Sequence, residues 1–139
     1  MAWLGGKWLT YEQRQQAIDE REAVCAEYSK LADDGIIEDY DILQWEFVED
    51  ELTKLKRVHA CEFDLLRFTY EYFSDSANPE NEINLIPEGQ TYKEAATFHQ
   101  TLCSLLDDIT QGKTDTSVAW SVGRRHAKTA YLSNAFLCH

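Results

Sequence analysis

The chain has 139 residues, 44% of them hydrophobic and 12% aromatic, which is enough for one domain-sized unit with its own core. No apolar run is long enough to span a membrane, and the apolar stretch at the start is too short for a signal peptide, so we expect a cytosolic protein rather than a membrane-spanning or secreted one. Residues 1–112 hold nine Lys and Arg against 24 Asp and Glu, whereas residues 113–139 hold four against one. The acidic body would repel a DNA backbone and only the basic C-terminal part could hold a phosphate, so we do not expect this chain alone to bind nucleic acid strongly. The alternative is that the acids simply solvate helix faces, as we expect most of them to do.

An N-terminal helical region is predicted over residues 1–75. It starts with a leader in which Gly5-Gly6 forms a flexible break between Trp3 and Trp8, and we expect both indoles to pack onto the body because exposed apolar patches are rare. The pattern Thr10-Tyr11-Glu12-Gln13 is typical of a capping box and predicts a helix over 11–31, which ends at Asp33-Asp34-Gly35.

A second helix is predicted over 39–56, because its apolar residues recur at helical spacing on one face: Ile42, Trp45, Val48, Leu52 and Leu55. A third, rich in aromatic residues, is predicted over 58–73. No Gly or Pro separates the two, so the pattern leaves open whether they form one rod or two helices.

Residues 76–90 carry both prolines with several asparagines and are predicted to form a loop. Beyond it, residues 91–139 are predicted to begin a second domain. Thr91 and Glu94 indicate a cap for a helix over 92–110, in which Phe98 lies on the apolar face and His99 on the solvent side. We interpret Asp107-Asp108 as the solvated end of this helix. The four cysteines match no zinc-ligand spacing and are interpreted as reduced core thiols.

The last segment combines a strand-like run over 117–122 with a basic turn and a helix-like stretch from residue 128. Strand, basic loop, Lys-Thr and helix make up the layout of a nucleotide-phosphate cradle, in which backbone N–H groups and a lysine hold the phosphates. Here Lys128-Thr129 fits the end of the pattern, but Ala127 replaces its second glycine and Gly123 stands one place late. The alternative, a basic loop that caps an ordinary helix, stays open on the pattern alone.

The string Gly-Arg-Arg-His-Ala-Lys-Thr resembles the deviant Walker A motif of phage terminase large subunits, and the resemblance extends upstream to about residue 58. It implies a mainly α fold, a helical domain followed by the strand–loop–helix start of an incomplete α/β ATPase, in the host cytoplasm. ATP with Mg²⁺ would be the cofactor: Lys128 would contact the β- and γ-phosphates, Thr129 would bind Mg²⁺ and Arg124 would stabilise phosphate charge. The remaining cradle, built from backbone N–H groups, would run through Gly123, Arg124, Arg125, His126 and Ala127.

This resemblance further implies an ATP-driven motor that packages phage DNA and contacts the small terminase subunit and the portal. ATP hydrolysis needs a second acidic strand and a water-positioning residue, and nothing after residue 129 can supply them. We therefore expect a truncated, non-catalytic form of a terminase, with DNA bound only by a full-length motor. The alternative is a stand-alone interaction protein, a decoy or regulator that binds a phage or host protein through its acidic helical body and the Trp3/Trp8 leader.

Overall fold

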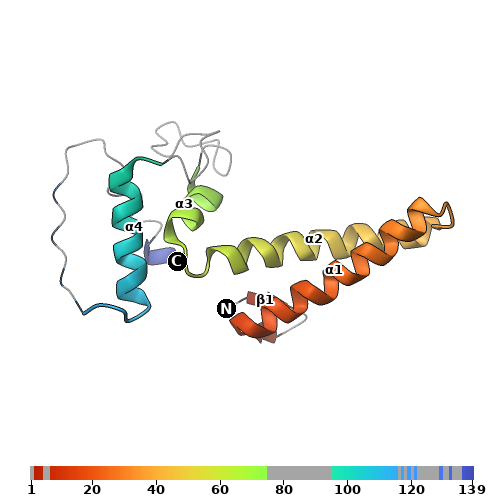
Figure 1. The fold of residues 1–139 in the computed structure, drawn as a ribbon, viewed down its shortest axis with the longest axis horizontal. Helices are drawn as coiled ribbons and strands as arrows, with labels where there is room; N and C mark the ends of the chain where they lie inside the picture. Colours follow the sequence, from red (N-terminus) through yellow and green to blue (C-terminus); the bar gives the residue numbers. More distant parts are fainter. Residues whose placement is uncertain are drawn as a thin grey trace. The chain divides into compact units, whose positions relative to one another are not determined.

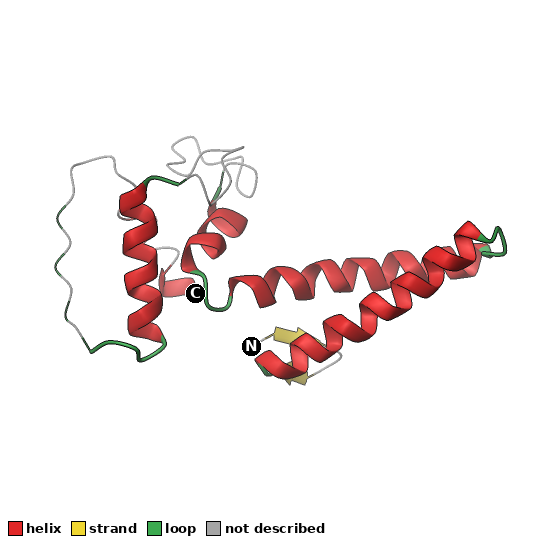
Figure 2. Cartoon of the chain, viewed as in Figure 1, coloured by secondary structure: helices red, strands yellow, loops and turns green. Residues whose placement is uncertain are grey.

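A computed structural model describes residues 2–4, 7–74, 95–115, 117, 119, 121, 129, 132 and 136–139. The described part is mainly helical, as predicted, with two short strands at its N-terminus (Figure 1 and Figure 2). The chain divides into two compact units, Met1–His59 and Ala60–His139, which are taken in turn below.

The first unit begins with an antiparallel hairpin of β1 (Ala2–Leu4) and β2 (Lys7–Leu9), in which Trp3 pairs with Trp8. The indole of Trp8 is 62% exposed, so the prediction that it packs onto the body is wrong. The reason is the strand pairing, which holds the Trp8 backbone in a two-stranded hairpin. A hairpin of this size buries little apolar surface, so the side chain stays largely exposed.

The first helix, α1 (Tyr11–Asp33), starts and ends where local sequence signals place its ends. The Thr10 hydroxyl accepts from the Gln13 N–H at 3.3 Å, and the Gln13 side chain accepts from the Thr10 N–H at 3.0 Å, which confirms the capping box. At the other end Gly35 has φ +67, and the N–H groups of Gly35 and Ile36 donate to the carbonyls of Ala32 and Leu31. This is a Schellman motif, which needs a residue that tolerates positive φ.

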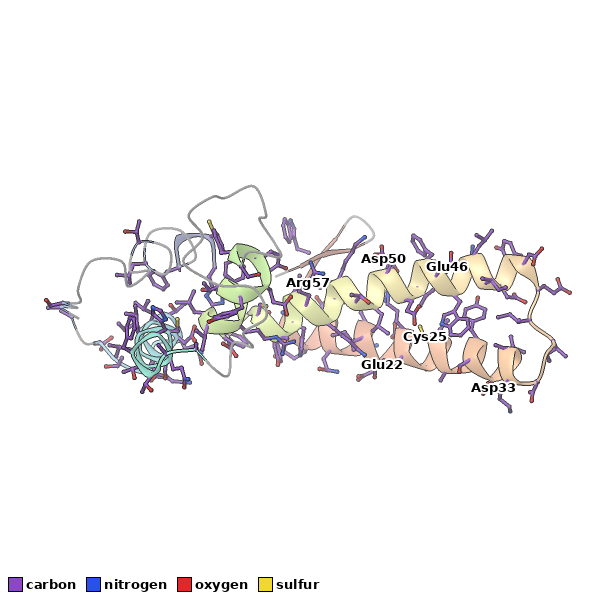
Figure 3. The ribbon with its side chains drawn as sticks, turned by 90° about the horizontal axis from the view of Figure 1, so that it is seen from above. Glu22, Cys25, Asp33, Glu46, Asp50 and Arg57 are labelled. Atoms are coloured by element: carbon purple, nitrogen blue, oxygen red, sulfur yellow. The ribbon has the colours of Figure 1, made fainter. Side chains whose placement is uncertain are left out.

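The second helix, α2 (Asp39–Cys61), runs antiparallel to α1 and packs beside it (Figure 1). Their shared core is small: Ala17, Ile18, Leu52 and Leu55 are buried, with Leu9 and Cys25 packed against them. Farther along the pair, the rings of Tyr28 and Trp45 stack with centroids 6.5 Å apart. Figure 3 shows Cys25 on the α1 side that meets α2.

Two ion pairs cross between α1 and α2. Arg21 meets Glu51 with an N···O distance of 3.0 Å, and Lys56 meets Glu22 at 2.6 Å. The Arg21–Glu51 pair is partly buried, so solvent and salt screen it less than a pair on the open surface. Both pairs fix the register in which α1 and α2 lie side by side.

The second unit contains α3 (Leu65–Phe73), α4 (Thr97–Thr110) and the short α5 (Phe136–Cys138). Helix α2 ends at Cys61, and Asp64 starts α3 by accepting from the Arg67 N–H at 2.9 Å, so the open question of one rod or two is decided in favour of two helices. The core of this unit consists of the buried residues Leu65, Leu102, Cys103 and Leu106, with Leu66, Phe68, Tyr70, Phe73, Leu132 and Phe136 packed against them.

Helix α4 starts later than predicted. Ala95 lies in a bend and Ala96 is the N-cap, so the helix begins at Thr97 rather than at 92, while Thr91 and Glu94 lie outside the described residues. The Gln100 side chain donates to the Ala95 carbonyl at 2.6 Å, a bond that competes with continuing the helix backward. Gly112, with φ +68, closes α4 with a second Schellman motif.

Candidate functional site

The predicted phosphate cradle lies almost wholly outside the described residues, which include neither Gly123 nor the positions from Arg124 to Lys128. Thr129 is described: its backbone is helical and its side chain is exposed, so its hydroxyl is accessible. In the preceding segment, Ser117, Ala119 and Ser121 are exposed and have no strand assignment, and the other residues of the predicted strand are outside the described part.

The described part of the second unit contains a pocket of about 280 Å³ between α3 and α4. Three carboxylates line it, those of Asp64, Asp107 and Asp108, together with Cys103 and Lys113. The two carboxylates nearest the start of α3 are engaged in capping it: Asp64 accepts from the Arg67 N–H, and both oxygens of Asp107 lie 3.1–3.2 Å from the Leu65 N–H.

This arrangement corrects the prediction that Asp107-Asp108 is a solvated helix end. The pKa of Asp107 is raised to about 6, chiefly by burial; the Leu65 hydrogen bond and His139 act against this rise, and the carboxylates of Asp64 and Asp108 add to it. Only Asp108 behaves as predicted, in an exposed ion pair with Lys113 at 3.5 Å.

The Cys103 thiol is held in its protonated form. Burial raises its pKa to about 12, and the nearby charges of Asp107 and Asp64 raise it too. Because the thiolate is the nucleophile, this cysteine is chemically quiet at neutral pH. The carboxylates of Asp64, Asp107 and Asp108 would repel a phosphate, so this pocket does not suit the nucleotide that the sequence predicts.

The described residues contain no candidate metal site, because no three or more of their His, Cys, Asp or Glu side chains form a group that could hold an ion. All four cysteines are free thiols, but only Cys61 and Cys103 are buried as the prediction of core thiols requires, whereas Cys25 is half-buried and Cys138 is exposed. Phe98 and His99 are both half-buried, with ring centroids 3.9 Å apart, so His99 does not simply face solvent as predicted.

In the first unit, a cluster of Tyr11, Arg14 and His59 closes the end of the α1–α2 pair. The His59 ring stacks on Tyr11 with centroids 4.0 Å apart, and the buried Arg14 guanidinium lies 5.7 Å from the same ring. Burial, and then the charge of Arg14, lower the pKa of His59, so its imidazole is neutral at pH 7. Burial also lowers the pKa of Arg14.

The feature that the sequence analysis missed lies on the outer face of α2 and the turn before it. Ile36, Tyr40, Leu43 and Phe47 are all large, apolar and exposed, by 62%, 68%, 63% and 60% respectively. Within α2, spacings of three and four residues place Tyr40, Leu43 and Phe47 in one row along the helix, and Ile36 belongs to the connection that precedes it. We call these four residues the outer stripe. The spacing itself is visible in the sequence, but the inner stripe through Leu52 and Leu55 had already accounted for a helix in 39–56.

Comparisons with models of known families, with curated proteins and with solved structures find no match to this chain. Within the described residues, no helix has both the length and the apolar character that crossing a bilayer requires.

Proposed function

We propose that this chain is the N-terminal region of a phage terminase large subunit, the ATP-driven motor for DNA packaging, up to its nucleotide-phosphate loop. The observation that carries the proposal is the motif from Gly123 to Thr129, in which Arg124, Ala127, Lys128 and Thr129 match the family pattern position by position. Thr129 supports it further, since its exposed side chain and helical backbone suit the residue that follows the loop and binds Mg²⁺.

In this proposal, Lys128 neutralises charge on the β- and γ-phosphates, and Arg124 adds a second cation at the γ end. Both charges lie in the basic C-terminal part of an otherwise acidic chain, where a triphosphate is attracted rather than repelled. The backbone N–H groups from Gly123 to Ala127 supply the remaining donors, because a phosphate oxygen accepts well from the N–H groups at the start of a helix. The small terminase subunit and the portal are the partners that the proposal implies.

The test is calorimetric titration of ATP with Mg²⁺ into the wild-type chain, into Lys128→Ala and into Lys113→Ala as a matched control. Lys113 is an exposed lysine of the same unit, paired only with Asp108 among the ion pairs of the described residues. The proposal expects the wild-type chain to bind ATP. Lys128→Ala should weaken this binding at least about tenfold, the effect of losing one good charged contact, and Lys113→Ala should leave it unchanged. Equal binding by all three chains, or binding by none, would refute it.

A second candidate function, a protein-interaction module, is favoured by the outer stripe. Four large exposed apolar side chains, three of them in one row along α2, make a patch of the kind that marks an interaction site. A photo-cross-linking amino acid at position 47, introduced in the organism that makes the protein, tests this candidate. It should yield a cross-link to another protein, whereas the same group at position 63 of the second unit should not. Failure to cross-link from position 47 would reject the candidate.

A further inference from the structure

We infer that the outer stripe of α2 is a docking surface for a basic amphipathic helix of another protein. The inference deepens the second candidate function by naming the chemistry of its partner, and it does not depend on the nucleotide site.

The first observation is the contrast between the two faces of α2. On the face toward α1, Leu52 and Leu55 are buried and Trp45 is half-buried, so this side is already used by the packing of the hairpin. On the outer face, the four residues of the outer stripe keep most of their surface in water. Nothing in the α1–α2 packing requires Tyr40, Leu43 or Phe47 to be apolar, since an exposed helix face is ordinarily polar.

The second observation is the charge around this row. Between Lys30 and Lys54 the chain has nine Asp and Glu and no Lys or Arg. Within the described residues, Asp50 pairs with Lys54 and Glu51 with Arg21, whereas the other seven carboxylates take part in no ion pair. These seven are Asp33, Asp34, Glu38, Asp39, Asp41, Glu46 and Glu49. The apolar row is therefore bordered by uncompensated negative charge.

The placement of the acids relative to the stripe is regular. Asp39, Glu46 and Asp50 are separated by seven and four residues, so they form a row next to the stripe along the same helix. All three are exposed, and Figure 3 shows Glu46 and Asp50 on the side of α2 away from α1. A partner that covers the stripe must therefore meet this acidic row at its edge.

Charge complementarity selects the partner. A second copy of the chain would bring acids against acids, and a DNA backbone or an anionic membrane would be repelled for the same reason. A helix with Lys or Arg beside its apolar row meets both requirements, because its apolar face covers the outer stripe while its cations face the acidic row. Tyr40 to Phe47 span about 10 Å at 1.5 Å per residue, so a partner helix of about two turns covers this part of the stripe.

The hairpin is suited to present this surface rigidly. Its core and the Arg21–Glu51 and Lys56–Glu22 pairs hold α1 and α2 together, and the Schellman motif at Gly35 fixes the turn beside Ile36. A surface whose backbone is already ordered loses less entropy when a partner binds.

The experiment uses the full chain and a fluorescein-labelled peptide of about 18 residues, or roughly five helical turns. Leucines recur along one face of this peptide and lysines or arginines occupy the rest. A scrambled peptide of the same composition has the same charge, but its leucines do not lie on one face. Comparing the two peptides shows whether binding needs the apolar face or only the charge. Binding is measured by fluorescence anisotropy near 0.15 M salt, because this salt concentration screens electrostatic attraction over distances beyond about 8 Å.

Two variants of the surface and two matched controls complete the design. Phe47→Ser removes an anchor of the stripe, and Phe63→Ser removes a phenylalanine of similar exposure, 52%, in the second unit. Asp39→Asn with Glu46→Gln removes two acids of the row, and Asp19→Asn with Glu20→Gln removes the same two charges from α1. Circular dichroism checks that each variant is folded. The charge variants alter no buried side chain, so they keep the test decisive if Phe47→Ser unfolds.

We expect the amphipathic peptide to bind more tightly than its scrambled form, and Phe47→Ser to weaken binding at least about tenfold, as loss of a central aromatic anchor does. The Asp39/Glu46 variant should weaken it several-fold, whereas both controls and Lys128→Ala should bind like the wild type. Equal binding of the two peptides, equal losses in the controls, or no saturable binding would overturn the inference. So would a homodimer in sedimentation that Phe47→Ser dissociates, because a second copy would then cover the stripe.

The outcomes are separable. If the cross-link from position 47 forms and the peptide fails to bind, the interaction module stands and the basic-helix partner is wrong. The ATP titration is read independently of both experiments.

Discussion

Replacing Asp107 by Asn tests the electrostatics at the start of α3. Burial raises the pKa of Asp107 from 3.8 to about 6, so between these values the folded chain holds a proton that the unfolded chain has released. Stability must then fall as the pH rises through this window, because the state with fewer bound protons is favoured at higher pH. Asn carries no such penalty, and its side-chain oxygen can still accept from the Leu65 N–H.

The magnitude follows from the shift. A rise of about 2.2 pH units, from 3.8 to about 6, corresponds to about 3 kcal/mol at 1.36 kcal/mol per unit. Asp107 is half-buried, so water screens part of this cost, and on the order of 1–2 kcal/mol is expected in practice. The advantage of Asp107→Asn over the wild type should therefore grow from about pH 4 to about pH 6 and then stay constant.

Urea unfolding of both chains, followed by circular dichroism in steps of pH, gives this difference directly. Asp108→Asn is the matched control: it removes the neighbouring charge from an exposed ion pair, where a change within about 0.5 kcal/mol is expected at every pH. An offset present at every pH, in addition to the part that grows with pH, would report only how the amide packs. A difference that is flat with pH, or that shrinks as the pH rises, would refute the reasoning.

Three further predictions concern folding. Thr10→Ala removes the capping box and should lower the free energy of unfolding by about 1 kcal/mol in urea titrations, while Thr10→Ser should restore most of it. Leu102→Ala, at a side chain only 1% exposed, should cost about 2–5 kcal/mol by the same method, and a loss below 1 kcal/mol would contradict its place in the core. With Ellman's reagent near pH 8, Cys138 should react at once and Cys103 only on unfolding, because burial raises the pKa of the Cys103 thiol to about 12; immediate reaction of both would be the contrary result.

Signals that act within one turn of helix could be predicted from the sequence. The start of α1 depends on Thr10 and Gln13, three residues apart, and its end depends on Gly35, whose positive φ suits glycine. Likewise the end of α4 is set by Gly112. In each case the residues that form the helix end lie within a few positions of one another, so a short sequence pattern is enough to predict their interaction.

Contacts between distant residues could not be predicted in this way. The break between α2 and α3 is stabilised locally by Asp64, but also by Asp107, which lies 42 residues beyond the Leu65 N–H that it caps. Read along the chain, Asp107 is merely an acid near a helix end, where the helix dipole disfavours it slightly. Its role as the cap of another helix depends on how α4 packs against α3. Most of the predicted phosphate cradle lies outside the described residues, so its outcome rests on the ATP titration.

The outer stripe was missed for a different reason, because α2 satisfies the helical pattern twice. One apolar row serves the core with α1, and a single row is all that an amphipathic helix of a hairpin needs. The second row adds nothing to the core, and its exposed apolar surface promotes association between copies of the chain. The acids beside it offset this tendency, since two like-charged surfaces repel each other while a basic surface is attracted. In the docking proposed above, the negative charge that first excluded DNA as a partner would disfavour contact between two copies of the outer stripe and would attract the cations of a basic helix.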